Sequence, residues 1–186
     1  ISDYRTNNEY AVKLSGVEID YQTRFWYLPG LLKGLVLNAN YTTIDSEVKY
    51  PRTIVDIAID WGPPLTTVTT NIDTFYVDRL LDQSDEVINL SIGYDYKGFS
   101  GRISMLQKAN TFTRTNFWPA LRESSDDYTR WDLSIKQKLP VKGLAIYLNV
   151  SNLTDEIDRT LVRGGNFPAF EEHYGKTIDL GFRYSF

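Results

Sequence analysis

The chain contains no cysteine and a single histidine, His173, among its 186 residues. The absence of cysteine excludes disulfide frameworks, thiolate zinc sites and thiol catalysis. One histidine cannot form a two-histidine metal cluster, and no G-x-S-x-G nucleophile motif accompanies it. We therefore predict that the chain is not an enzyme and has no catalytic residue, no metal site and no cofactor.

Long apolar runs and an excess of positive charge are also missing. No stretch approaches the roughly 18 apolar residues of a transmembrane helix. The net charge is -4 and the pI about 5.0, so we do not expect the basic face that nucleic-acid binding requires. The first residues, ISDYRTNNEY, carry no basic and apolar leader. We therefore expect the chain to be a piece of a longer protein or a processed form.

Aromatic residues, by contrast, are abundant. They make up 14% of the chain, with 13 Tyr and 4 Trp, although the mean hydropathy is -0.33. Aromatic side chains with one polar end lie well at the headgroup level of a bilayer, and membrane barrels carry girdles of them. The composition therefore favours a membrane β-barrel over a water-soluble domain.

Hydrophobicity alternates with a period of two residues along most of the chain, which is typical of β-strands. In the last segment, Ile178, Leu180 and Phe182 share one face, whereas Asp179 and Arg183 lie on the other. Strands are expected at residues 10–28, 34–45, 87–96, 99–111, 128–139, 143–152 and 174–186.

The connections between these strands alternate strictly in length. A β-sandwich also alternates in hydrophobicity, but it has no reason to keep its long loops at one end. An outer-membrane barrel has short periplasmic turns and long extracellular loops. The pattern therefore predicts an all-β fold, an antiparallel transmembrane β-barrel. The short links are 29–33, 97–98 and 140–142, and the long ones are 46–86, 112–127 and 153–173.

Seven strands are an incomplete set, because single-chain bacterial barrels have an even number and open edges cannot be left in lipid. The chain is therefore expected to supply the last seven strands of a larger barrel, with residues 1–186 forming part of one barrel domain.

The C-terminal segment fits the outer-membrane assembly signal, which combines a polar residue, a glycine, alternating apolar or aromatic residues and a terminal Phe. Its positions here are Asp179, Gly181, Tyr184 and Phe186. Together with the NLTD sequence at 152–155 and the segments GVEIDYQTRFWYLPGLLKGLVLNANYT and VINLSIGYDYKGFSGRIS, it resembles the last strands of TonB-dependent receptors. The resemblance covers most of residues 16–186 and is weakest at 46–86.

The resemblance implies a barrel of about 22 strands with a plugged lumen in the bacterial outer membrane. It implies active, TonB-coupled uptake of a scarce solute such as a siderophore, cobalamin or an oligosaccharide. Expected partners are the TonB complex, acting through a plug domain and TonB box upstream of these residues, the barrel assembly machinery, outer-membrane lipid and a surface lipoprotein. The alternatives are a passive porin-like channel, a soluble β-sandwich that binds carbohydrate, and an outer-membrane hydrolase, which the shortage of candidate bases disfavours.

Aromatic side chains in the long links are the expected ligand contacts, because aromatic faces stack on sugars and on aromatic siderophores. They are Trp61, Tyr76, Phe117, Trp118 and Phe167. Acidic pairs next to strand ends could bridge through divalent cations to lipopolysaccharide, although solvated loop charge is the simpler interpretation. These pairs are Asp85-Glu86, Asp126-Asp127 and Glu171-Glu172.

Overall fold

The computed structural model of this chain describes residues 7–186. It comprises two compact units, one of residues up to Ser15 with Asp45–Leu80 and the other of Gly16–Ile44 with Leu81–Phe186. The second unit is the larger one and contains nearly all of the predicted strands. Among the described residues, no helix is long and apolar enough to cross a membrane.

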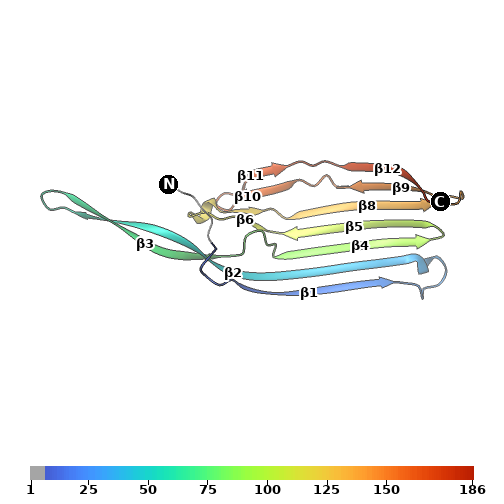
Figure 1. Cartoon of the computed structure of the whole chain (residues 1–186), viewed down its shortest axis with the longest axis horizontal. Coiled ribbons are helices and arrows are strands. Elements are labelled where there is room, and N and C mark those ends of the chain that lie inside the picture. The colour runs from blue at the N-terminus through green and yellow to red at the C-terminus, as the bar shows by residue number, and fades with distance from the viewer. Residues whose placement is uncertain (1–6) are drawn as a thin grey trace. The chain divides into compact units, whose positions relative to one another are not determined.

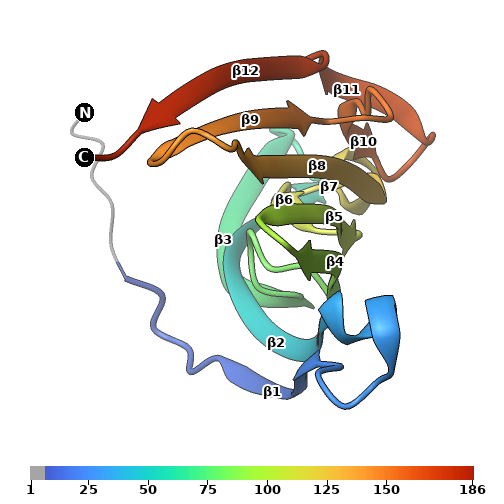
Figure 2. The same ribbon diagram turned by 90° about the vertical axis from the view of Figure 1, so that its right-hand side faces the viewer.

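The second unit is built on one continuous antiparallel sheet (Figure 1), whose strands follow an arc in Figure 2. The strands lie in the order β1-β2-β4-β5-β8-β9-β12, so each pairs with a neighbour close in chain order, as in the wall of an up-and-down barrel. All of the predicted strands are present. They are β1 (Lys13–Arg24), β2 (Leu35–Asp60), β4 (Glu86–Tyr96), β5 (Phe99–Ala109), β8 (Tyr128–Lys138), β9 (Leu144–Ser151) and β12 (Thr177–Tyr184).

The short links lie together at one end of these strands (Figure 1), as predicted. The link between β4 and β5 is a turn at Lys97 and Gly98, whose φ values are 44° and 83°. Positive φ at both positions is the type I′ geometry that matches the twist of a β-hairpin, and Gly98 adopts it without steric cost. The link before β2 contains a short 3-10 helix, η1 (Gly30–Gly34).

Cross-strand pairing aligns apolar residues into rows that run across the sheet. In an antiparallel pair, directly opposed residues have their side chains on the same face. The rows therefore form a continuous apolar band, and the predicted apolar face is confirmed from β2 to β12. One row contains Leu37, Ile92, Ile103, Leu133, Val150 and Ile178.

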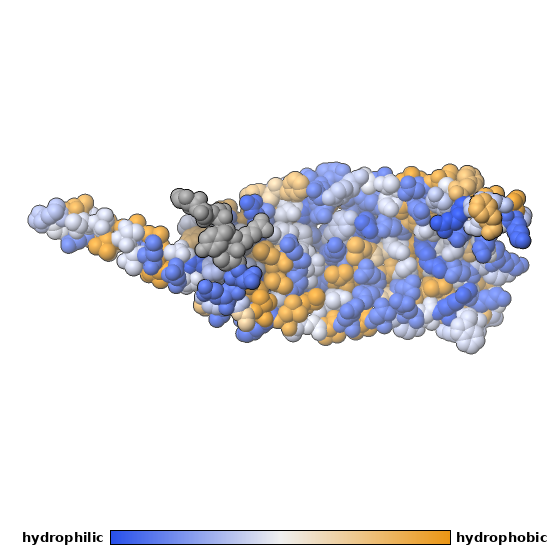
Figure 3. Space-filling model, in the orientation of Figure 1, coloured by the Kyte–Doolittle hydropathy of each residue, from blue (hydrophilic) through white to orange (hydrophobic). Residues whose placement is uncertain are grey.

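This apolar band is exposed, and Figure 3 shows apolar residues at the surface beside polar ones. In β12, the side chains of Ile178, Leu180 and Phe182 are each 67% exposed. A β-sandwich would bury such a face against a second sheet about 10 Å away. An exposed band is what a wall facing lipid requires, so the structure argues against the soluble β-sandwich.

The prediction of a loop without strands at 46–86 is wrong. Strand β2 continues to Asp60 and forms a long hairpin with β3 (Thr66–Asp78), which makes up most of the first unit. Alternation is present in the hairpin, where Ile54 opposes Ile72. The sequence pattern is obscured because Pro51 and several charged residues interrupt the apolar positions.

The loops predicted at 112–127 and 153–173 are also partly wrong, because these segments form a four-stranded sheet in the order β11-β10-β7-β6. Its buried centre is the Phe112 ring, and the Arg163 guanidinium carbon lies 4.5 Å from the centroid of that ring. Strands of three residues have no recognisable local pattern, and distant partners hold them in place. The elements are β6 (Phe112–Arg114), the 3-10 helix η2 (Pro119–Leu121), β7 (Glu123–Ser125), β10 (Asp158–Val162) and β11 (Phe167–Glu172).

The first and last strands are shorter than predicted. Strand β1 begins at Lys13 and ends at Arg24 because the chain then turns toward Pro29 and Gly30, and the Phe25 N–H donates to the Leu35 carbonyl at 3.0 Å. Strand β12 covers 177–184, where β9 provides a partner at every position, instead of the predicted 174–186.

Candidate functional site

The face of the larger sheet opposite the apolar band is lined by small polar side chains. Ser104 Oγ donates to Ser91 Oγ at 3.0 Å, and Ser134 Oγ donates to Asn149 Oδ1 at 2.8 Å. Each of these hydrogen bonds joins neighbouring strands. A face of this kind is compatible with water, and in a membrane barrel it lines the lumen.

A charged pair lies on the same polar face near the short links. Arg102 Nη1 and Nη2 donate to Asp95 Oδ1 and Oδ2 at 2.9 and 2.7 Å, which is the bidentate geometry that makes arginine–carboxylate pairs strong. A Cβ atom at Gly93 would lie 2.3 Å from Arg102 Cδ. The missing side chain of Gly93 therefore leaves the room in which the guanidinium crosses to Asp95.

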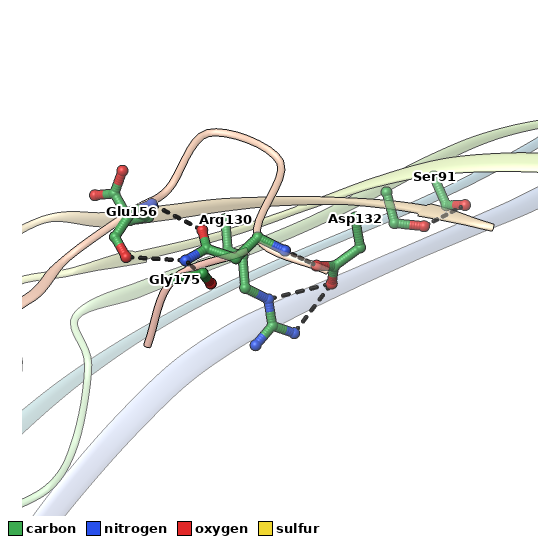
Figure 4. A network of polar contacts seen from close by, with 7 residues as sticks. Ser91, Arg130, Asp132, Glu156 and Gly175 are labelled. Atoms are coloured by element: carbon green, nitrogen blue, oxygen red, sulfur yellow. Dashed lines mark hydrogen bonds and ion pairs between the residues drawn. The ribbon is translucent and has the colours of Figure 1, made fainter. Parts of the chain in front are cut away.

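At the opposite end of the strands, Asn152 is the buried centre of a polar network, in which Figure 4 labels Arg130, Asp132, Glu156 and Gly175. Asn152 follows β9 directly and is only 5% exposed. Its backbone has a positive φ of 56°. Asn152 Nδ2 donates to the carbonyls of Glu156 and Gly175, each at 3.1 Å, and Asn152 Oδ1 accepts from the Glu156 N–H at 2.8 Å. The NLTD sequence thus fixes the start of the connection to β10 and ties it to the segment before β12.

The network continues into the polar face through Asp132. Its Oδ1 accepts from the Asn152 N–H at 2.9 Å, and its Oδ2 accepts from Arg130 Nε at 3.1 Å. Both oxygens of Asp132 therefore accept hydrogen bonds, and the Arg130 guanidinium is held on the polar face of β8 (Figure 4).

A cleft of about 590 Å³ lies beside this network, between the polar face of the larger sheet and the four-stranded sheet. This volume falls in the range of about 300–1,000 Å³ that is usual for small-molecule sites. The larger sheet contributes Leu106, Lys108, Tyr128, Arg130, Ser151 and Thr177. The smaller sheet contributes Thr113, Ser125, Asp158, Thr160, Phe170 and Glu172.

Tyr174, which precedes β12, also lines the cleft. Its hydroxyl donates a hydrogen bond to Glu172 Oε2. This bond raises the pKa of Tyr174 above its ordinary value of 10.0, with smaller contributions from burial and from the nearby negative charge. The hydroxyl therefore stays protonated at any physiological pH and remains a hydrogen-bond donor.

The structure places the predicted loop aromatics outside this cleft. Trp61 and Tyr76 belong to the first unit, where Trp61 follows β2 and Tyr76 stacks on Tyr50 with ring centroids 5.3 Å apart. Phe117 and Trp118 lie in the second unit and pack edge to face at 5.0 Å, just before η2.

Phe167, the fifth predicted aromatic, begins β11 and lies close to the same region as η2. The neighbouring turn approaches that helix, because the Gly164 N–H donates to the Ala120 carbonyl at 2.8 Å. A Cβ atom at Gly165 would lie 2.5 Å from the Phe167 ring. The Phe167 ring therefore packs against Gly165 in the turn before β11.

The aromatic residues that line the cleft are not among those that the sequence predicts as ligand contacts; they are Tyr128, Phe170 and Tyr174. Tyr128 begins β8 and lies on its polar face, and Phe170 lies inside a segment predicted to be a loop. No local signal marks Phe170, because the segment FPAFEE does not alternate between apolar and polar residues. The pairing of β10 with β11 places Phe170 in the small sheet, where it lines the same cleft as Tyr128.

His173 and the acidic pairs show no arrangement for metal binding. Among residues 7–186, no group of three or more His, Cys, Asp or Glu side chains could hold a metal ion. His173 Nε2 lies 3.8 Å from Glu171 Oε2, and Glu171 accepts from Arg159 Nε at 2.9 Å. The Glu171-Glu172 pair, expected beside a strand, instead ends β11 itself.

The residues of the predicted assembly signal lie in and just after β12. Gly181 is on the polar face, where a Cβ atom would lie 2.3 Å from the Tyr147 hydroxyl oxygen, so the Tyr147 ring covers this glycine. Tyr184 and Phe186 are exposed and pack edge to face with centroids 5.5 Å apart. Asp179 is opposite Asn149 on the polar face.

The family model described as TonB dependent receptor-like, beta-barrel matches residues 2–153, which is more than half of the chain and ends before β12. No curated protein and no solved structure matches the chain.

Proposed function

The chain belongs to the β-barrel family of TonB-dependent receptor-like proteins, and on this basis we propose that it is part of the wall of an outer-membrane transporter that imports a scarce solute with energy from the TonB complex. Members of this family are receptors and transporters of the outer membrane, not enzymes. In the proposed protein, residues 1–186 belong to a single barrel domain of about 22 strands, and a plug domain outside these residues fills the lumen and contacts TonB.

The observation that carries the proposal is the separation of the two faces of the sheet. One face is an exposed band of uncharged apolar rows, and the other holds Ser, Asn and paired charges. Lipid accepts the first face, while a water-filled or plugged lumen accepts the second. The cleft beside Asn152 lies on the lumen side, at the end with the long connections, where a ligand would arrive from outside the cell.

The proposed partners follow from this placement. Outer-membrane lipid covers the apolar band, and the barrel assembly machinery inserts the last strand. TonB acts through the plug, and a surface lipoprotein is proposed to deliver ligand at the end with the long connections. The loop aromatics Trp61, Tyr76, Phe117, Trp118 and Phe167 remain proposed contacts for such outer partners or ligands.

A conductance measurement distinguishes a plugged transporter from a passive porin-like channel. The full-length native protein, purified from outer membranes and inserted in a planar bilayer, is expected to show no steady conductance, because the plug fills the lumen. Urea at a concentration that unfolds the plug, while the barrel stays folded, should open the lumen and produce a steady conductance. A native chain of about three or more times 21.4 kDa is expected in the same preparation. Steady conductance without urea would contradict active transport and favour the channel.

We also propose that the assembly machinery recognises four residues in and just after β12, which are Asp179, Gly181, Tyr184 and Phe186. Replacing Gly181 with valine is expected to lower the folded fraction in outer membranes several-fold. Strand β12 would still pair with β9. The valine side chain, however, displaces the Tyr147 ring and changes the surface of the strand that the machinery binds. The measurement is heat-dependent gel mobility of the full-length protein in isolated outer membranes.

A double variant separates assembly from packing. Gly181→Val with Tyr147→Ser restores the space over the strand, and Tyr147→Ser alone serves as the control. If the machinery reads Gly181, the double variant refolds in detergent without the machinery yet still assembles poorly in cells. Normal assembly of the double variant in cells would mean that Gly181 only accommodates Tyr147.

A further inference from the structure

We propose that the cleft between the polar face and the four-stranded sheet binds a neutral, hydroxyl-rich ligand, an oligosaccharide of two to four sugar units. This inference rests on the proposed function, since it names the class of solute that the transporter would take at its outer end. Three features of the cleft point to this class: exposed aromatic rings, a high density of hydroxyl groups, and balanced charge.

The aromatic rings of the cleft are available for stacking. Phe170 is 59% exposed and Tyr174 is 68% exposed, and Tyr128 also lines the cleft. In the described part of the chain, Phe170 forms no ring pair with another aromatic residue. An apolar ring left in water in this way gains free energy when a flat, partly apolar ligand covers it. The C–H face of a sugar ring has that character.

The walls around these rings carry hydroxyl groups from both sheets. Ser151 and Thr177 lie on the larger sheet, while Ser125 and Thr160 lie opposite each other on the smaller one. A hydroxyl can both donate and accept a hydrogen bond, and so can each hydroxyl of a sugar. A ligand with acceptors alone would use only part of this surface.

The charges of the cleft cancel. Lys108 and Arg130 contribute two positive charges, and Asp158 and Glu172 contribute two negative ones, so the sum over the lining residues is zero. Arg130 is further neutralised by Asp132, whose carboxylate lies 3.1 Å from the guanidinium. A strongly anionic ligand, such as a ferric catecholate, would meet carboxylates without an excess of cations. The charge balance therefore favours a neutral ligand over a ferric siderophore.

Carboxylates also suit sugar binding in a direct way. Asp158 is opposite Glu172 in the pairing of β10 with β11, so both side chains lie on the face that lines the cleft. A carboxylate accepts hydrogen bonds from two neighbouring hydroxyls at once. The Tyr174 hydroxyl fixes one oxygen of Glu172 and leaves the other oxygen to the ligand.

The proposal is tested by isothermal titration of the full-length native protein in detergent. The probes are maltotriose, cellotriose, xylotriose and mannotriose, with a ferric catecholate complex as the anionic comparison. We expect at least one trisaccharide to bind. Phe170→Leu, which keeps an apolar side chain but loses the aromatic face, should weaken that binding at least about tenfold. Phe170→Trp should retain it within a factor of about three.

Matched controls keep the result interpretable. Tyr27→Ala removes an exposed aromatic residue at the end with the short links and should leave sugar affinity unchanged. Heat-dependent gel mobility establishes that each variant is folded. The proposal is overturned if no trisaccharide binds, if Phe170→Leu and Phe170→Trp bind sugar equally well, or if the ferric catecholate binds and Phe170→Leu weakens it. If the sugar proposal fails in this way, the absence of steady conductance in the planar bilayer would still support a transporter. Steady conductance there would instead contradict the proposed function itself.

Discussion

Replacing Asn152 with leucine is expected to lower the free energy of unfolding of the full-length barrel by about 3–5 kcal/mol. The side chain is buried and makes three hydrogen bonds to backbone groups of Glu156 and Gly175. Leucine leaves those groups without their partner, and because Glu156 and Gly175 are only half-buried, so that water replaces part of the bonding, the loss costs about 2–3 kcal/mol in all. It also places a bulky residue at a φ of 56°, which costs about 1–2 kcal/mol more.

Asn166 provides the matched control for this prediction. It has a φ of 50° but is exposed, in the turn between β10 and β11. Asn166→Leu should therefore carry only the backbone cost of about 1–2 kcal/mol. The measurement is denaturant unfolding of both variants in the same lipid, with a fluorescence readout. Equal losses for the two variants would show that the hydrogen bonds of Asn152 contribute little and that backbone conformation alone matters.

The second large effect is expected on the apolar face. Ile103 lies near the middle of β5, in the row between Ile92 and Leu133. Ile103→Arg would place a charge close to the centre of the bilayer, which costs about 2–4 kcal/mol in membrane barrels. We expect a loss of this size in unfolding free energy in lipid vesicles, together with a lower folded fraction in outer membranes.

The neighbouring residue tests whether the two faces are assigned correctly. Ser104 is on the polar face, so Ser104→Arg should cost only the hydrogen bond to Ser91, about 1 kcal/mol. The comparison places the same side chain at adjacent positions of one strand. If Ser104→Arg were the more damaging change, the polar face would be the one that meets lipid, and the lumen-side cleft would have to be abandoned.

The sequence identified most of the larger sheet correctly. The strand predicted at 87–96 is β4 at Glu86–Tyr96, and the turn at 97–98 is present with its left-handed geometry. These features could be predicted because alternation and turn chemistry involve residues next to one another in the chain. The NLTD sequence and Gly181 are recognisable as motifs in the sequence. Only the structure shows their local roles, which are a buried hydrogen-bonding centre at Asn152 and space for the Tyr147 ring at Gly181.

The long connections could not be predicted in the same way. The hairpin of β2 and β3 was missed because Pro51 and charged residues break the pattern, and the four-stranded sheet was missed because β6 and β7 have three residues each. Such short strands are held by partners elsewhere in the chain, as in the pairing of Thr160 with Ser125. Their stability is therefore not a property of their own sequence.

The sequence by itself determined which face of each strand is apolar, because side chains alternate sides along any extended backbone whatever the strand pairs with. Only the tertiary structure decided which segments of the long connections pair, and hence where the cleft lies. Tyr128, Phe170 and Tyr174 converge there because β8, β11 and the segment before β12 are brought together by pairing between distant parts of the chain. Contacts of that kind depend on the whole arrangement of the sheets, and no local pattern encodes them.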